Sequence, residues 1–301
     1  MDDPPSTTAG AAVATVVAPT ITQPTLLDVL DVFWHIFSNV MKYEYKPVIL
    51  GITQSTYKPV HDITTVPYYT ITIDRETAMT MATFEMNESY DTIIGDFGED
   101  RSYELIAAFA KWAQCDFSMV CMYEPIVQKL LEINAKADWI VIHHPKYRFL
   151  LGMHDTEPAE LTHSVMLVST DEESYIADFT VEQHGWDSSN FLTPVNEYLE
   201  NFTYDRRWSH APSFVTDSRN DPSGRVLTNF VREFSDGFDW SELVGMDNHQ
   251  LGYHVSARVR EAIESYQVPP IVRNLSPTHD AEDGEDNRQD GNLNDTAMPD
   301  A

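Results

Sequence analysis

Residues 163–180 read HSVMLVSTDEESYIADFT, two apolar runs joined by a short polar connection. Such a pattern is typical of a β-hairpin. If the loop has an even number of residues, paired positions sum to an odd number such as 343, which places Asp178 opposite Val165 and His163 one diagonal step away on the same face. Because a buried imidazole and a buried carboxylate each need a hydrogen-bond partner, we expect His163 and Asp178 to bond to each other.

The hairpin belongs to a longer block of strand-like runs with short polar connections. This block comprises residues 138–144, 147–153, 163–169 and 174–180. Apolar residues at helical spacing predict helices before and after the block. These helices cover residues 25–43, 100–113, 115–135, 190–202, 225–234 and 253–266. A further strand is predicted at 66–73, and 77–86 fits either a helix or a strand. Helices that precede and follow a block of antiparallel strands along the sequence are typical of an α+β fold.

Individual residues mark where some of these helices begin or break. Thr25 is the expected N-cap of the first helix, and Asp100 or Ser102 is that of the second. Pro125 falls inside the run at 115–135, where it predicts either a kink or the first turn of a new helix.

Composition divides the chain into four segments. Residues 1–24, rich in Ala, Thr and Pro, are predicted to be disordered, and so is the acidic tail at 271–301. Between them we expect one α+β domain at 25–205, in which an antiparallel sheet packs against helices. A helical C-terminal extension is expected at 206–270.

The chain is strongly acidic, with a net charge of −29 and an isoelectric point near 4.4. This charge argues against binding to nucleic acid or to an anionic membrane surface, because both would repel it. The N-terminal apolar patch follows two Asp residues, unlike a signal peptide, and the sequence lacks a run of about 18 apolar residues. We therefore expect a cytoplasmic protein whose partner or substrate is a protein or peptide. Its oligomeric state is left open.

Cys115 and Cys121 are the only cysteines in the sequence. Their spacing on a predicted helix disfavours a disulfide, so free thiols are expected. Cys115 lies at the start of that helix, where the helix dipole favours a thiolate. His163 would then act as its general base and Asp178 would orient the ring. The side chain of Gln114, or the backbone amide of Cys115, could donate a hydrogen bond to an oxyanion.

The order of these pieces resembles the papain-like cysteine hydrolase and transglutaminase-core superfamily. The matching segments are QCDFSMV at 114–120, HSVMLVS at 163–169 and YIADFT at 175–180. The run DFTVEQHGW at 178–186 also looks like the segment that follows the third residue in some transglutaminase-like proteins. The resemblance covers roughly 100–205 of the chain. It implies a thiol hydrolase, deamidase or acyltransferase that acts on an amide or ester bond, with the residues just named at its site and no cofactor.

The sequence leaves two other interpretations open. In the first, the chain is a non-catalytic α+β protein in which the cysteine only packs, and the aromatic segment 234–266 or the acidic tail contacts a protein partner. In the second, a metal ion is held by histidines and aspartates. The candidate ligands are His143, His144, His154, His163, His184, Asp155 and Asp178. Arg206 and Arg207 form a basic patch, which predicts either salt bridges or an anion site.

Overall fold

The computed structural model describes residues 23–73, 81–83, 88–154, 158–212 and 222–266. Residues 1–271 group into one compact unit, and the second unit, 272–301, lies outside the described residues. The disorder predicted for residues 1–22 and for the acidic tail also falls outside them, as does most of the ambiguous run at 77–86. Within the described parts, none of the helices combines the length and the apolar character needed to cross a membrane.

The described residues form a mixture of helices and strands, which confirms the predicted α+β class. The helices are α1 (Leu26–Lys42), α2 (Glu88–Ile94), α3 (Glu99–Lys111), α4 (Cys115–Leu131), α5 (Val195–Phe202), α7 (Pro222–Asp236), α8 (Trp240–Leu243) and α9 (Asn248–Tyr266). The strands are β1 (Tyr45–Pro47), β2 (Ile49–Tyr57), β3 (Val66–Ile73), β4 (Met81–Thr83), β5 (Lys136–Ile142), β6 (Leu150–Met153), β7 (His163–Ser169), β8 (Ser174–Ala177), β9 (Leu192–Pro194) and β10 (Trp208–His210). Short 3-10 helices cover Gly95–Phe97, Val181–His184 and Ser188–Asn190.

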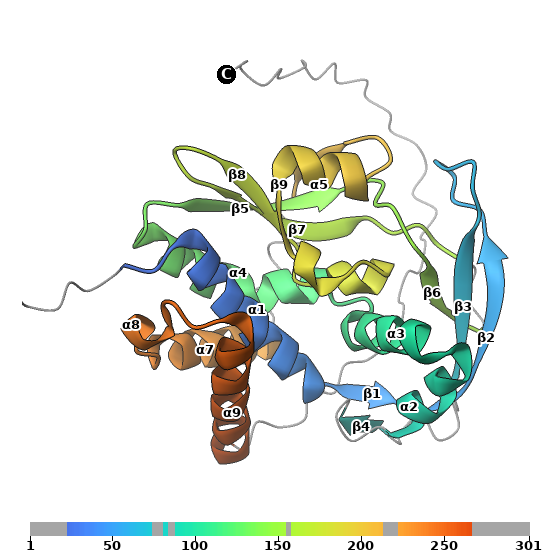
Figure 1. Cartoon of the computed structure of the whole chain (residues 1–301), viewed down its shortest axis with the longest axis horizontal. Helices are drawn as coiled ribbons and strands as arrows, with labels where there is room; N and C mark the ends of the chain where they lie inside the picture. The colour runs from blue at the N-terminus through green and yellow to red at the C-terminus, as the bar shows by residue number, and fades with distance from the viewer. Residues whose placement is uncertain (1–22, 74–80, 84–87, 155–157, 213–221, 267–301) are drawn as a thin grey trace, which may run out of the picture. The chain divides into compact units, whose positions relative to one another are not determined.

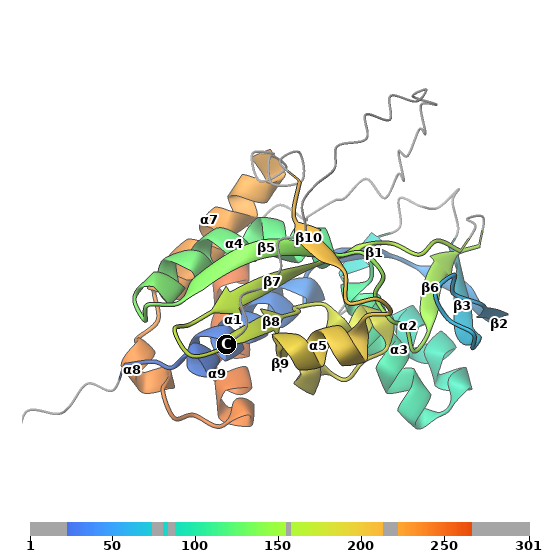
Figure 2. The same ribbon diagram turned by 90° about the horizontal axis from the view of Figure 1, so that it is seen from above.

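The central sheet has five strands in the order β10-β5-β7-β8-β9, and every neighbouring pair is antiparallel (Figure 2). The β7–β8 hairpin pairs Met166 with Ala177 and Ser169 with Ser174. Both pairs sum to 343, which confirms the register expected from the sequence. The four-residue loop and the apolar alternation therefore determine which face of the sheet each side chain of this hairpin occupies.

One strand of the predicted antiparallel block belongs to a different sheet. Strand β6 pairs in parallel with β3, in a three-stranded sheet with the order β2-β3-β6. Phe149, directly before β6, is fully buried and packs edge-on against Tyr69 of β3. This contact belongs to an apolar cluster that also holds Leu105 and Phe109 of α3. Burial against α3 places β6 in the second sheet, which the local strand pattern could not indicate.

Helices cover both faces of the five-stranded sheet (Figure 1). On one face, buried side chains of α1, α4, α7 and α9 share a core with strands β5, β7 and β8. On the other face, Tyr198, Leu199 and Phe202 of α5 pack on strand residues such as Val165. Residues 206–266 thus supply both an edge strand and core helices. Phe234 and Phe238 of the aromatic segment are buried in the first core.

The start of α1 follows the prediction. The backbone N–H of Asp28 donates to Thr25 Oγ1 at 3.2 Å, and the N–H of Thr25 donates to Asp28 Oδ2 at 2.8 Å. This reciprocal capping box satisfies two N–H groups that a helix end leaves unpaired.

The start of α3 differs from the prediction that Asp100 or Ser102 caps it. The helix begins one residue earlier, after Gly98, and has no side-chain cap. Ser102 lies inside the helix and is buried, where its hydroxyl donates to the carbonyl oxygens of Ile94 at 2.6 Å and Gly98 at 2.7 Å. Because this hydroxyl is buried by tertiary packing, it bonds to backbone carbonyls and does not cap the helix.

Two further helices differ in extent from their predicted ranges. Helix α4 continues through Pro125 to Leu131 as one helix, so a new helix does not begin at Pro125. The run at 190–202 is helical only from Val195, because residues 192–194 form β9 and pair with β8.

Candidate active site

A tight turn between α3 and α4 positions Cys115. Trp112 has φ −60° and ψ 129°, Ala113 has φ 56°, and the N–H of Gln114 donates to the carbonyl of Lys111 at 3.1 Å. These values describe a type II turn, whose third residue needs a positive φ and is usually glycine. The turn ends one residue before α4, so Cys115 is the first residue of that helix, as predicted.

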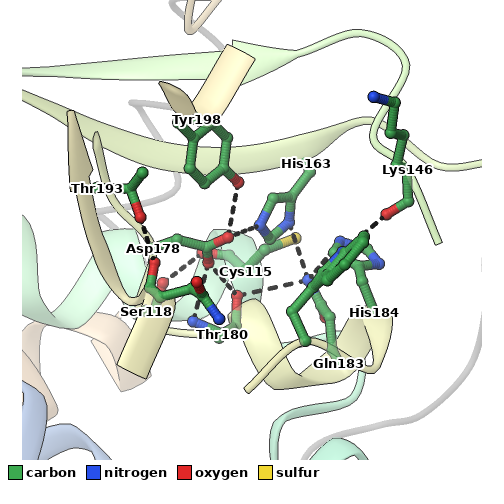
Figure 3. Close-up of polar contacts among 12 residues, drawn as sticks. Cys115, Ser118, Lys146, His163, Asp178, Thr180, Gln183, His184, Thr193 and Tyr198 are labelled. Atoms are coloured by element: carbon green, nitrogen blue, oxygen red, sulfur yellow. Dashed lines mark hydrogen bonds and ion pairs between the residues drawn. The ribbon is translucent and has the colours of Figure 1, made fainter. Parts of the chain in front are cut away.

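His163 and Asp178 meet at the open end of the β7–β8 hairpin. His163 is the first residue of β7, and Asp178 directly follows β8. Nε2 of His163 lies 2.8 Å from Oδ2 of Asp178, and both side chains are fully buried. The hydrogen bond expected from the hairpin register is therefore present (Figure 3).

Asp178 is held by further donors. The hydroxyl of Tyr198 donates to Oδ2 at 2.7 Å, and the N–H of Thr180 donates to Oδ1 at 3.0 Å. Burial raises the pKa of Asp178, but the charge and hydrogen bond of His163 and the hydroxyl of Tyr198 outweigh it and leave the pKa below its ordinary value. The carboxylate therefore stays ionised and keeps one orientation.

The thiol of Cys115 is close enough to the His163 ring to act on its pKa. Figure 3 shows the sulfur beside the His163 ring. Burial lowers the pKa of His163, but the Asp178 carboxylate and then the Cys115 thiol raise it more, to about 10. Since this is far above neutral, the ring is an imidazolium at pH 7.

Gln183 and His184 complete the surroundings of the ring. The Gln183 amide lies 2.9 Å from Nδ1 of His163, and the His184 ring stands edge-on to His163 at a centroid distance of 4.4 Å. Burial first, and then the charge of His163, hold the pKa of His184 well below its ordinary value. His184 is therefore neutral beside a charged His163.

A buried ion pair anchors the short helix Val181–His184 that carries these two residues. Nζ of Lys111, at the end of α3, lies 2.7 Å from Oε1 of Glu182. The same Nζ lies 4.7 Å from the centre of the Trp34 ring. The end of α3 thus holds both the turn before Cys115 and the helix that carries Gln183.

A second contact fixes α4 against β7. The hydroxyl of Ser164 donates to Oδ1 of Asp116, the residue after Cys115. Because Ser164 follows His163 in the strand, this hydrogen bond holds the first turn of α4 next to the first residues of β7. The pairing of the two elements brings thiol and imidazole together.

An open pocket of about 460 Å³, mouth included, lies beside Cys115. Cys115 is partly exposed, whereas Cys121 is fully buried in the core, and the two do not form a disulfide. A substrate could therefore reach one cysteine and not the other.

Unlike the other predicted site residues, Gln114 forms a side-chain hydrogen bond outside the site. Its buried side-chain amide donates to Oε1 of Glu44 at 3.0 Å. Its predicted hydrogen bond to an oxyanion stays a prediction, as does that of the Cys115 backbone amide. The sequence assigned no role to Tyr198 or Gln183, and it offered His184 only as a candidate metal ligand. Gln183 and His184 fall in the run DFTVEQHGW, which carries part of the family resemblance, whereas Tyr198 lies outside it.

The candidate metal ligands do not form a cation site in the described part of the chain. No group of three or more His, Cys, Asp or Glu there has the arrangement needed to hold a metal ion, and Asp155 lies outside the described residues. His144 bonds to Asp205 at 2.7 Å. Arg206 and Arg207 pair with acidic neighbours at 3.5 and 3.9 Å, so they form salt bridges.

Comparison with known proteins adds no assignment to this site. No family model matches the chain, and searches of the curated proteins and of the solved structures found no match.

Proposed function

We propose that the protein is a thiol-dependent acyl-transfer enzyme in which Cys115 attacks the carbonyl of an amide or ester. The observation that carries this proposal is the position of His163. The buried ring is hydrogen-bonded to the Asp178 carboxylate, and the partly exposed Cys115 thiol lies beside it (Figure 3). Nucleophile, base and orienting carboxylate are the three parts that such catalysis needs.

The first step transfers the acyl group to the enzyme. The thiol proton resides on His163, and the thiolate forms a C–S bond with the carbonyl carbon while the carbonyl oxygen takes up the electron pair. When the C–N or C–O bond then breaks, His163 returns its proton to the leaving group. Asp178 stabilises the imidazolium throughout and does not itself take the proton.

The second step releases the acyl group. His163, now neutral, takes a proton from water or from an amine, which attacks the thioester carbon. The C–S bond then breaks to release the thiolate, and the proton stays on His163. Water gives hydrolysis or deamidation, and an amine gives transfer. The two steps share one site because only the acceptor differs.

The oxyanion is assigned to the first turn of α4. The first N–H groups of a helix have no partner within the helix, and that of Cys115 lies next to the reacting sulfur. Gln114 would have to exchange its hydrogen bond to Glu44 to take part. The order of cysteine at a helix start, histidine at a strand start and aspartate after the next strand supports the proposed papain-like or transglutaminase-like relationship.

The protonation of His163 has a consequence for Gln183. An imidazolium donates from both ring nitrogens, so the Gln183 amide has to face Nδ1 with its oxygen in that state. A half-turn of the amide group satisfies this, because its two ends are nearly equivalent in shape. Gln183 can thus support the ring in both of its protonation states.

The test is the rate of alkylation of the folded protein by iodoacetamide between pH 5 and 9, with the labelled cysteine located by mass spectrometry. We expect Cys115 to react rapidly at pH 6 in the wild type and slowly in His163→Ala. Cys121 in the same molecule is the control, because its burial should protect it. Circular dichroism would verify that the variant is folded.

Slow labelling of both cysteines that rises only above about pH 8, the ordinary thiol range, would overturn the proposal. Rapid labelling of Cys115 that His163→Ala leaves unchanged would also overturn it, because the ring would then have no part in activating sulfur. Either result favours the non-catalytic binding protein.

A further inference from the structure

The pocket beside Cys115 has an apolar lining that comes from three parts of the chain. The α3–α4 turn supplies Trp112 and Ala113, the β6 region supplies Tyr147, Leu150 and Leu151, and the segment before β7 supplies the rest of one wall. That last group is Ala159, Leu161 and Thr162. Gln183 and His184 close the pocket next to the thiol.

Apart from the reacting Cys115, the polar side chains that face the pocket are uncharged. The Tyr147 hydroxyl donates to the carbonyl of Leu161 at 3.1 Å, and burial, followed by the charge of Glu160, raises its pKa above the ordinary value. His184 is neutral for the reasons given above. Gln183 and Thr162 carry no charge. A charged substrate group in this space would lose its hydration without gaining an ion-pair partner.

Nearby charge acts against an anion in particular. Glu160 lies between two lining residues, and its carboxylate accepts hydrogen bonds from the Tyr57 hydroxyl at 3.1 Å and from the backbone N–H of Val60. The chain as a whole carries a net charge of −29. Both facts disfavour a carboxylate or phosphate in the pocket.

We infer that the pocket binds an uncharged apolar or aromatic group of the substrate, carried next to the carbonyl that Cys115 attacks. The inference rests on the proposed function, because that function identifies the carbonyl. The preference of the pocket for an uncharged group depends only on its apolar wall and on the lack of a countercharge. The substrate class is therefore an amide or ester with a hydrophobic group beside the reacting bond, such as a peptide with an aromatic or branched aliphatic side chain there.

The test compares chloroacetamides that share one reactive group and differ in the attached substituent. The probes are chloroacetamide itself, its N-benzyl form, its N-carboxymethyl form and its N-(2-aminoethyl) form. Alkylation rates of Cys115 are divided by the rates of the same probes with glutathione, which removes intrinsic reactivity. We expect the benzyl probe to react with saturation and about tenfold faster than chloroacetamide, as burial of an aromatic ring predicts. The carboxymethyl probe should be the slowest.

A matched pair of variants locates the selection. Leu161 lines the pocket with 62% of its surface exposed, and Leu131, at the far end of α4, is 63% exposed. Leu161→Lys should lower the benzyl preference and raise the relative rate of the carboxymethyl probe. Leu131→Lys adds the same charge at the same exposure and should leave all the rate ratios unchanged.

Each outcome separates this inference from the proposed function. If iodoacetamide labels Cys115 in a His163-dependent way but the benzyl probe shows no preference, the substrate class is wrong and the function stands. A fastest rate for the aminoethyl probe would also overturn the substrate class, because Glu160 would then dominate. If the benzyl probe saturates and is preferred but His163→Ala changes no rate, the pocket is supported and the catalytic proposal fails.

Discussion

At the scale of single residues, Asp178 is the group on which the state of His163 depends. Asp178→Asn keeps the shape of the side chain and removes the charge that stabilises the imidazolium. We expect the rate of Cys115 alkylation at pH 6 to fall by roughly 10- to 100-fold, since the pKa of the His163 ring is lower without the neighbouring negative charge. The rate is measured with iodoacetamide, as a function of pH.

Tyr198→Phe is the matched control for that change. It removes one hydrogen bond to the same carboxylate but leaves the charge and the 2.8 Å contact to His163. We expect a loss of about 2 kcal/mol in the free energy of unfolding, as for a hydrogen bond to a charged group, measured by urea denaturation. Alkylation at pH 6 should change little. An equal loss of reactivity in both variants would show that the hydroxyl, and not the charge, controls the ring.

Ala113 is a second residue with a testable cost. It occupies the left-handed region at φ 56°, which an alanine adopts with strain. We expect Ala113→Gly to raise the free energy of unfolding by about 0.5–1 kcal/mol. Ala107→Gly, inside α3 and only partly buried, is the control and should lower it by about 1 kcal/mol. Destabilisation by both changes in thermal unfolding would mean that the turn is not strained.

At the scale of elements, the Lys111–Glu182 pair joins the end of α3 to the short helix that carries Gln183 and His184. Both side chains are buried. Lys111→Met leaves a buried carboxylate without its countercharge and is expected to cost about 3 kcal/mol of unfolding free energy. Burial raises the pKa of Glu182 despite the lysine, so the single variant should be least stable at high pH.

The double variant Lys111→Met/Glu182→Gln isolates the charge effect. It removes both charges, and we expect it to recover more than half of the stability lost in Lys111→Met, since an uncharged pair has no large desolvation penalty. Urea unfolding at pH 7 measures the three free energies. Additive losses from the two substitutions would contradict the ion-pair interpretation.

The elements themselves were mostly predictable from local pattern. Strand β3, at Val66–Ile73, and the start of α1 after Thr25 agree with the expected positions, because alternation and capping are local properties. The pairing of β6 with β3 was not predictable. It depends on the burial of Phe149 against α3, a contact between distant parts of the chain.

At the scale of the whole molecule, the buried site makes stability depend on pH. The pKa of His163 is raised from 6.5 to about 10, so the imidazolium stabilises the folded state fully below about pH 6.5 and this contribution is lost as the pH rises through about 10. The groups that face the ring are Asp178, Cys115, Gln183 and His184.

We therefore expect the free energy of unfolding, measured with urea at pH 7 and pH 10.5, to fall more steeply in the wild type than in His163→Gln. The variant keeps a polar side chain but does not titrate in this range. Parallel curves for the two proteins would contradict the raised pKa. If the variant does not fold, the NMR titration of the His163 ring in the wild type decides the same point.

Sequence alone determined the parts of this protein that depend on near neighbours in the chain. The four-residue loop and the apolar alternation specified the register of the β7–β8 hairpin, and with it the meeting of His163 and Asp178. Only the tertiary structure decided what surrounds that pair. Tyr198, the Lys111–Glu182 ion pair and the apolar pocket beside Cys115 are made by segments that packing alone brings together. Pattern within a short window carries no information about such contacts, because their distance depends on how whole helices and sheets bury their apolar faces.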